Sequence, residues 1–142
     1  MSEPEFDRKE LTVQASLTQL IPIWEFIETG LDAFQCPEKV RIHIRIAADE
    51  IFSNIARHSN ARKGDTVTVS FHAEKEPRSV VITFMDTSRP FDPLSAAEPD
   101  LSAPAKNRKI GGLGLFMLKK IMDDVSYEYR DEKNILTIKK RL

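Results

Sequence analysis

Three glycines fall within four positions in the stretch GGLGL, residues 111–115, directly before an apolar helical pattern. Bare backbone amides and the positive end of a helix dipole together form a site for an anion such as phosphate. Lys106, Arg108 and Lys109 precede the glycines and supply cationic phosphate donors. The pattern is neither a P-loop, since no Gly-Lys-Ser/Thr follows, nor a Rossmann loop, which needs a strand immediately before it. The alternative is a flexible hinge at Gly111 and Gly112.

A second candidate is Asp86, which ends a predicted strand in the stretch MDTSRPFDP, residues 85–93. A carboxylate at a strand end beside a pocket accepts a hydrogen bond from an exocyclic amine and rejects a carbonyl in the same place. The alternative is a plain turn in which Asp86 and Ser88 supply local hydrogen bonds.

The third candidate is a polar arc on a predicted helix, in the stretch ADEIFSNIARHS, residues 48–59. Glu50 and Asn54 are four residues apart, so both side chains point to one side. At 100° per residue Arg57 falls between them and slightly behind, and His58 lies at the edge of the arc. Taken alone, such an arc is also typical of a solvated helix face.

The elements that must position these residues follow from hydrophobic periodicity. We predict strands over 9–17, 65–76, 77–88, 125–130 and 134–142, and helices over 16–34, 36–60 and about 113–123. The proline-rich stretch 89–109 has little periodicity, which is typical of a lid, a binding loop or disorder. Because strands and helices do not alternate strictly, we expect an α+β sandwich, with one mostly antiparallel, mixed sheet and helices on one face.

Composition narrows the class of protein. The 142 residues fit a single domain over 1–142, and 41% hydrophobic with 30% charged residues is ordinary for a soluble protein. A net charge of −1 argues against a binder of nucleic acid or of an anionic membrane surface, and no apolar run is long enough to span a membrane. The single cysteine, Cys36, favours a reducing cytoplasm.

The order and spacing of the three candidates resemble a known superfamily. The set E-x-x-x-N on a helix, D-x-x-x-P-F-D after a strand and G-G-x-G-L opening a helix resembles the N, G1 and G2 boxes of the GHKL ATP-binding superfamily. The resemblance covers about residues 9–142. It is closest to the small anti-sigma-factor serine/threonine kinases of the RsbW type, which also share the closing stretch NILTIKKRL, and it implies the Bergerat-type ATP-binding fold.

The resemblance also implies roles for individual residues. Asn54 would bind Mg²⁺ through its amide oxygen, Glu50 would be the general base, and Asp86 would read the adenine amine. Residues 93–110 would form the lid over ATP. The implied nucleotide site consists of Asn54, Arg57, His58, Asp86, Ser88, Pro90, Arg108, Lys109, Gly112, Leu113, Gly114, Leu115 and Thr137, the last of these through its hydroxyl.

One position departs from the family pattern. Ser88 stands where the G1 box normally has glycine, two residues after Asp86. If the position needs a positive φ or the closest approach to adenine, serine costs about 1 kcal/mol. We therefore expect serine to weaken nucleotide binding and Ser88→Gly to tighten it.

The implied function is an ATP- and Mg²⁺-dependent protein serine/threonine kinase that phosphorylates a small STAS-type anti-sigma-factor antagonist. The first alternative is a non-catalytic ATP-binding module that sequesters a sigma factor or another partner. The second is a detached histidine-kinase-like catalytic domain, which is disfavoured because no dimerisation helix pair with a phospho-acceptor histidine is present. The family also implies a homodimer.

Overall fold

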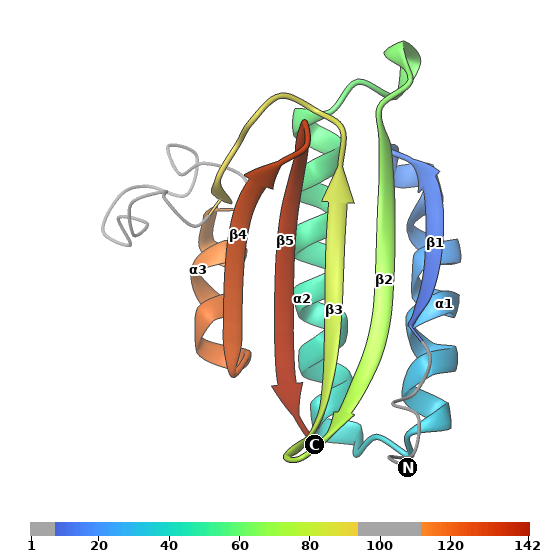
Figure 1. Ribbon diagram of the computed structural model, residues 1–142, viewed down its shortest axis with the longest axis vertical. Helices are drawn as coiled ribbons and strands as arrows, with labels where there is room; N and C mark the ends of the chain where they lie inside the picture. The colour runs from blue at the N-terminus through green and yellow to red at the C-terminus, as the bar shows by residue number, and fades with distance from the viewer. Residues whose placement is uncertain (1–7, 94–111) are drawn as a thin grey trace.

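The computed structural model describes residues 8–93 and 112–142. Five strands and three α-helices follow one another in the order β1, α1, α2, β2, β3, α3, β4, β5, with two short 3₁₀ turns at Leu17–Gln19 and Ala61–Lys63 (Figure 1). The bounds are β1 Lys9–Gln14, α1 Leu20–Ala33, α2 Glu38–His58, β2 Thr66–Lys75, β3 Arg78–Asp86, α3 Gly112–Ile121, β4 Asp124–Arg130 and β5 Lys133–Arg141.

The strands form one sheet in the order β1-β2-β3-β5-β4, and every neighbouring pair is antiparallel. Figure 1 shows α1 behind β1 and β2, and α2 behind the central strands, so that the helices cover one face only. This two-layer arrangement confirms the predicted α+β sandwich. The predicted elements are all present, with ends that differ by a few residues.

The long helix α2 has signals at both of its ends. Pro37, in an extended conformation, is the residue before its first turn, and Glu38 lies in that turn, where the helix dipole favours an acid. Arg57 and His58 lie in the last turn, where the dipole favours a cation. Between these ends the apolar side packs into the core through Ile44, Ala47, Ala48, Ile51, Phe52 and Ile55.

Helix α1 lies close to the sheet because of one glycine. A Cβ atom on Gly30 would lie 2.7–2.8 Å from three ring atoms of Phe71, which is too close for any real contact. Phe71 itself is 1% exposed and belongs to the core. Glycine at position 30 therefore lets α1 approach β2 until the aromatic ring packs directly against the helix backbone.

The β4–β5 hairpin closes with the two residues Asp131 and Glu132, whose φ angles are 53° and 61°. Two consecutive positive φ values are typical of the tight turns whose twist matches that of the strands. The turn fixes the register in which Asn134 pairs with Tyr129 on β4 and with Asp86 on β3. It therefore places Asn134 beside the end of β3.

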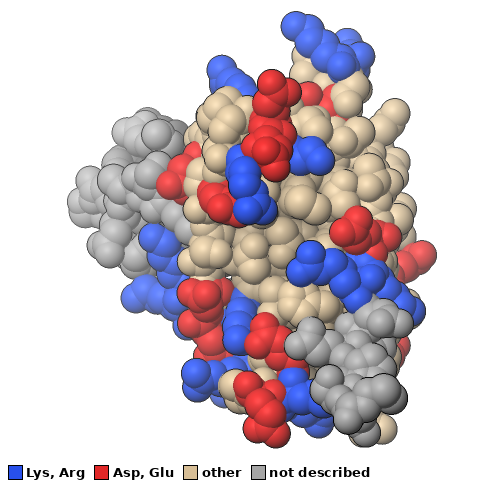
Figure 2. Space-filling view, viewed as in Figure 1, with Lys and Arg blue, Asp and Glu red and all other residues tan. Residues whose placement is uncertain are grey.

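The other face of the sheet has no helix over it. Strand alternation places Ser70, Thr83 and Thr137 on this face, at paired positions on β2, β3 and β5. The hydroxyl oxygens of Thr83 and Thr137 are 3.3 Å apart. Figure 2 shows a broad uncharged area on this side, bordered by groups of charged side chains. Within residues 8–93 and 112–142, no helix is long and apolar enough to cross a bilayer.

Candidate nucleotide site

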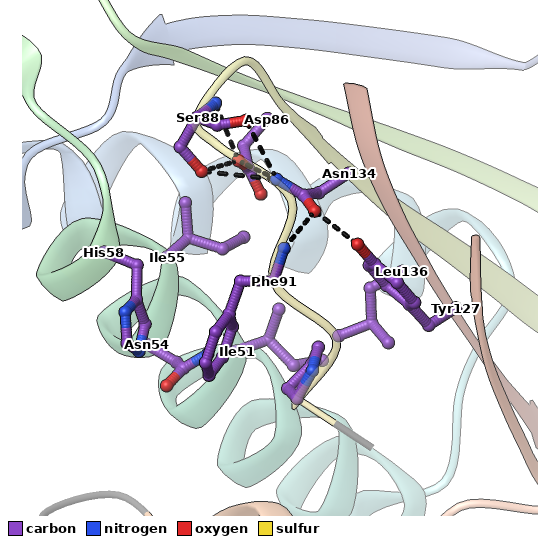
Figure 3. Close-up of a pocket in the computed structure, with 11 residues that line it drawn as sticks. Ile51, Asn54, Ile55, His58, Asp86, Ser88, Phe91, Tyr127, Asn134 and Leu136 are labelled. Carbon is purple, nitrogen blue, oxygen red and sulfur yellow. Dashed lines mark hydrogen bonds between the residues drawn. The ribbon is translucent and has the colours of Figure 1, made fainter. Parts of the chain in front are cut away.

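A pocket opens between α2 and the end of the sheet where β3 stops (Figure 3). Apolar side chains form most of its wall, and four polar residues stand at one end. The lining residues are Ile51, Asn54, Ile55, His58, Asp86, Ser88, Phe91, Pro93, Tyr127, Asn134 and Leu136. An apolar slot with a few fixed polar groups is typical of a small-molecule site, and in this structure its cavity volume of about 20 Å³ leaves room for about one water molecule.

At the polar end, one carboxylate oxygen of Asp86 accepts several hydrogen bonds. The backbone amide of Ser88 donates to Oδ1 at 3.1 Å, and Nδ2 of Asn134 donates to the same oxygen at 3.0 Å. The hydroxyl of Ser88 makes a third, short hydrogen bond to it. All three residues are at most 7% exposed. The carboxylate orientation is therefore fixed through Oδ1, and Oδ2 carries none of these bonds.

Asn134 is the centre of this network. Besides Asp86, its Nδ2 donates to the backbone carbonyls of Ser88 at 3.2 Å and Arg89 at 2.9 Å. Its Oδ1 accepts from the amide of Phe91 at 2.9 Å and from the hydroxyl of Tyr127 at 2.5 Å. One buried side chain thus ties β5 to the loop after β3, as the dashed lines in Figure 3 show.

Across the pocket, His58 and Phe91 form an aromatic stack. Their ring centroids are 3.9 Å apart and the ring planes differ by 24°. Burial lowers the pKa of His58 below its usual value, Arg57 and Arg89 lower it further, and Asp86 partly opposes them. The imidazole is therefore held neutral at physiological pH, which suits a ring that stacks on an apolar partner.

The polar arc of α2 reaches the pocket only in part, since Glu50 and Arg57 are not among the lining residues. Asn54 lines the pocket and is 7% exposed, and Glu50 lies one turn earlier on the same side of the helix. Oε1 of Glu50 is buried and has no hydrogen-bond partner among residues 8–93 and 112–142. The nearest cation, Nη2 of Arg57, is 3.9 Å from it. Desolvation raises the pKa of Glu50, Arg57 opposes the rise, and Asp49 adds to it.

The residues present fit a magnesium–nucleotide complex. Mg²⁺ is bound by only one or two protein oxygens in such sites and takes the rest from phosphates and water, which matches the single amide of Asn54. A buried carboxylate oxygen without a partner, as in Glu50, needs a proton, a water or a cation beside it. Asp86 offers an acceptor for an exocyclic amine at the other end of the pocket.

The sequence-predicted site residues are only partly brought together. Asn54, His58, Asp86 and Ser88 line one pocket, and Pro90 lies in the loop between Ser88 and Phe91. Gly112, Leu113, Gly114 and Leu115 form the start of α3. Arg108, Lys109 and the predicted lid over 93–110, apart from Pro93, lie outside the described residues.

Thr137 does not reach the pocket. Asn134 and Leu136 line the pocket, and Thr137, on the alternate side of the strand, faces the uncovered side of the sheet beside Thr83. The expectation that its hydroxyl holds the adenine end is therefore not met by the geometry. Asn134 occupies that end instead. The sequence contained a signal for Asn134, because this polar residue alternates in step with Leu136 and Ile138, which face inward.

The strain expected at Ser88 is also absent. Ser88 is not among the described residues with a positive φ, so its backbone has no need of glycine. Its hydroxyl bonds to the Asp86 carboxylate, which a glycine could not do. The tightening expected for Ser88→Gly therefore loses its physical basis.

Comparisons with known proteins agree with this geometry. The family model described as the histidine kinase-like ATPase domain matches residues 13–140. The serine/threonine-protein kinase BtrW of Bordetella bronchiseptica is 28% identical over 100 residues, covering 70% of each chain. The serine-protein kinase RsbW of Halalkalibacterium halodurans is 32% identical over 95 residues, covering 66% of this chain and 57% of the relative.

A second RsbW, from Listeria innocua, is 28% identical over 101 residues, covering 68% of this chain and 63% of the relative. The alignments thus span less than two thirds of each RsbW kinase. The family match, in contrast, spans both the α2 segment and the β3–β5 end of the sheet that form the pocket. The chain therefore belongs to the histidine kinase-like ATPase domain family and is related to the RsbW-type serine-protein kinases.

Proposed function

We propose that this chain is an ATP-dependent protein serine/threonine kinase that acts as an anti-sigma regulator in the cytoplasm. Mg-ATP would bind between α2 and the end of β3, and the γ-phosphoryl group would pass to a hydroxyl of a small STAS-type antagonist. The observation that carries the proposal is Glu50, a partly buried carboxylate one turn from Asn54, with a raised pKa and a buried oxygen without a hydrogen-bond partner in the described structure. A purely structural helix position gains nothing from such a group.

Glu50 would act as the general base. It takes the proton of the acceptor hydroxyl as the hydroxyl oxygen bonds to the γ-phosphorus and the bond to the β-phosphate oxygen breaks, so that ADP leaves. A raised pKa brings the carboxylate closer to the operating pH, which improves proton transfer. Asn54 would hold Mg²⁺, which neutralises charge on the phosphates when it is bound.

The remaining residues would bind and orient the nucleotide. Asp86 would accept the adenine N6 amine, while Ser88 and Asn134 hold its carboxylate in place. The start of α3 would present backbone amides to the phosphates from Gly112 to Leu115. Arg57 and His58 would border the site from α2, and Arg108 and Lys109 would supply positive charge to the phosphates.

The partner is proposed from the relatives, because three curated relatives are named serine or serine/threonine kinases. A STAS-type antagonist is proposed as the phosphoacceptor, and a sigma factor as a protein that the chain sequesters. A homodimer is proposed as the assembly.

The test is nucleotide titration followed by transfer. Because a site built to accept a hydrogen bond rejects a carbonyl in its place, Mg-ATP should stabilise the protein far more than Mg-GTP in a thermal-shift assay. Labelled γ-phosphate should then appear on an antagonist protein encoded near this chain. Equal responses to ATP and GTP would contradict the role of Asp86. If the chain binds ATP and the antagonist but transfers no phosphate, its function would be that of a non-catalytic module that sequesters a partner.

A further inference from the structure

A second groove lies on the opposite flank of α2, between the last turn of that helix and the segment that leads into α1. Ala15, Ala56 and Ala61 contribute apolar wall, and Arg57 and Arg62 contribute two guanidinium groups. No lining residue is acidic. The groove is thus cationic in a protein whose net charge is −1, and bulk electrostatics does not account for it.

The cations of this groove are weakly paired. Arg57 has one carboxylate neighbour, Glu50, at 3.9 Å, which is a long separation for an ion pair. Arg62 makes no ion pair within residues 8–93 and 112–142 in this structure and is exposed. The nearby acid, Asp65, accepts a hydrogen bond from the amide of Asn60 at 2.6 Å and so holds the turn. Both guanidinium groups remain available to an incoming anion.

Ser59 also lines the groove. Its hydroxyl oxygen is shielded from solvent and has no hydrogen-bond partner among the described residues, so a ligand in the groove would not meet it. The groove therefore offers two forked cationic donors.

Arg57 connects this groove to the proposed base. Its side chain lines the groove and also lies beside Glu50. The guanidinium Nη2 of Arg57 lies 3.9 Å from Oε1 of Glu50, and successive residues of an extended peptide are about 3.5 Å apart. A chain whose hydroxyl reaches Glu50 would therefore place a residue one or two positions away beside Arg57.

We propose that this groove binds an acidic segment of the phosphoacceptor protein, with a carboxylate one or two residues from the serine that is phosphorylated. The inference rests on the proposed kinase function and names the substrate class of that site. Charge complementarity selects the occupant: guanidinium forks pair bidentately with carboxylates, and the apolar wall suits a peptide backbone with small side chains. The same contact would draw Arg57 away from Glu50 when the substrate binds.

The experiment uses two labelled serine peptides that differ only at the two positions before and the two positions after the serine. One carries aspartate at these positions and the other carries asparagine. Binding to the full chain is measured by fluorescence anisotropy, and phosphate transfer to each peptide is measured separately with Mg-ATP. The aspartate peptide should bind roughly tenfold more tightly, since hydrogen bonds to charged groups contribute about that factor.

Two variants locate the effect. Arg62→Glu should abolish the preference for aspartate and should bind a lysine version of the peptide better than wild type does. Arg130→Glu, an equivalent change of an exposed arginine on β4, should keep the preference. Equal affinity of wild type for the two peptides, or a preference that survives Arg62→Glu, would overturn the inference.

Different outcomes would contradict the kinase proposal and the groove proposal. If wild type transfers phosphate to both peptides equally well and binds them equally, the kinase stands and the groove inference falls. If the aspartate peptide binds through Arg62 and no phosphate is ever transferred, the groove is a binding site and the kinase proposal falls.

Discussion

The sheet end of the pocket and the arc of α2 beside it, the helix end, surround their carboxylates in opposite ways. At the sheet end, Asp86, Ser88 and Asn134 are almost completely buried and hydrogen-bonded to one another. At the helix end, Glu50 is partly buried, has an oxygen with no hydrogen bond in the described structure, and lies 3.9 Å from its nearest cation. Both ends contain a carboxylate, but only the carboxylate of Asp86 is fixed by hydrogen bonds.

The difference indicates a division of labour. A carboxylate that reads a base must point in one direction before the ligand arrives, because orienting it later reduces affinity. A carboxylate that takes a proton must have a raised pKa, which requires burial without strong partners. Under the proposed function, the hydrogen-bond network at the sheet end stabilises the fold, whereas the desolvated carboxylate of Glu50 would lower stability in return for reactivity.

The largest effect is expected at the helix end. Glu50→Gln keeps the size of the side chain and removes the base, so phosphate transfer should fall by roughly 10²–10⁴-fold while ATP binding changes little. The measurement is single-turnover transfer alongside nucleotide titration. Asp49→Asn is the matched control, because Asp49 is a neighbouring carboxylate whose pKa burial also raises. Transfer at the wild-type rate in Glu50→Gln would exclude Glu50 as the base.

The next effect is on folding, at the sheet end. Asn134→Ala removes one of the three hydrogen bonds to the Asp86 carboxylate and leaves the Phe91 amide and the Tyr127 hydroxyl without this partner. The free energy of unfolding should fall by about 1–3 kcal/mol, measured by urea denaturation. Ile135→Ala, on the same strand and the opposite face, is the control for a simple loss of side chain. A stability loss no greater than that of Ile135→Ala would mean that the network contributes nothing.

A smaller effect tests whether ATP binding depends on the hydroxyl group of Ser88 or on the backbone conformation at this position. Ser88→Ala and Ser88→Gly both remove the hydroxyl that bonds to Asp86. Each should weaken ATP binding by a few-fold, since a hydrogen bond contributes about 0.5–1.5 kcal/mol. Isothermal titration of both variants is the measurement. Tighter binding in Ser88→Gly alone would restore the view that this position needs glycine.

The smallest expected effect is the stability that the protein loses because the carboxyl group of Glu50 is desolvated. Burial raises the pKa of Glu50, so its contribution to stability is present at pH values below its unfolded pKa and is lost as pH rises through the raised one. Glu50→Gln should therefore melt at a higher temperature than wild type near neutral pH, and the gap should close as the pH falls below that raised pKa. Thermal melts from pH 4 to 8 on this variant check it. A constant gap at every pH would show that packing, not charge, causes the difference.

The sequence was sufficient to place Glu50 and Asn54 on one side of α2. Glu50 and Asn54 share a face because helical spacing alone determines it, and the strand that ends at Asp86 followed from alternation. The layered fold followed from the order of the elements. These predictions depend on local periodicity, which a single sequence carries.

The sheet end required contacts between residues distant in sequence. Asn134 bonds to Asp86 across 48 positions, and no local pattern specifies which strand lies beside β3. Thr137 was selected as a hydroxyl in the right strand, and alternation then placed it on the uncovered face. The role of Ser88 also depends on the carboxylate beside it rather than on its own backbone.

The tight β4–β5 turn limits which insertions and deletions this chain can accept. Asp131 and Glu132 are all that separates the strands, and Asn134 lies two positions after the turn. Inserting a single residue there, without a compensating bulge, would shift the phase of β5 and bring Lys133 into the position that Asn134 occupies beside Asp86. Insertions and deletions in this hairpin should therefore be tolerated only in pairs, although the turn itself is exposed.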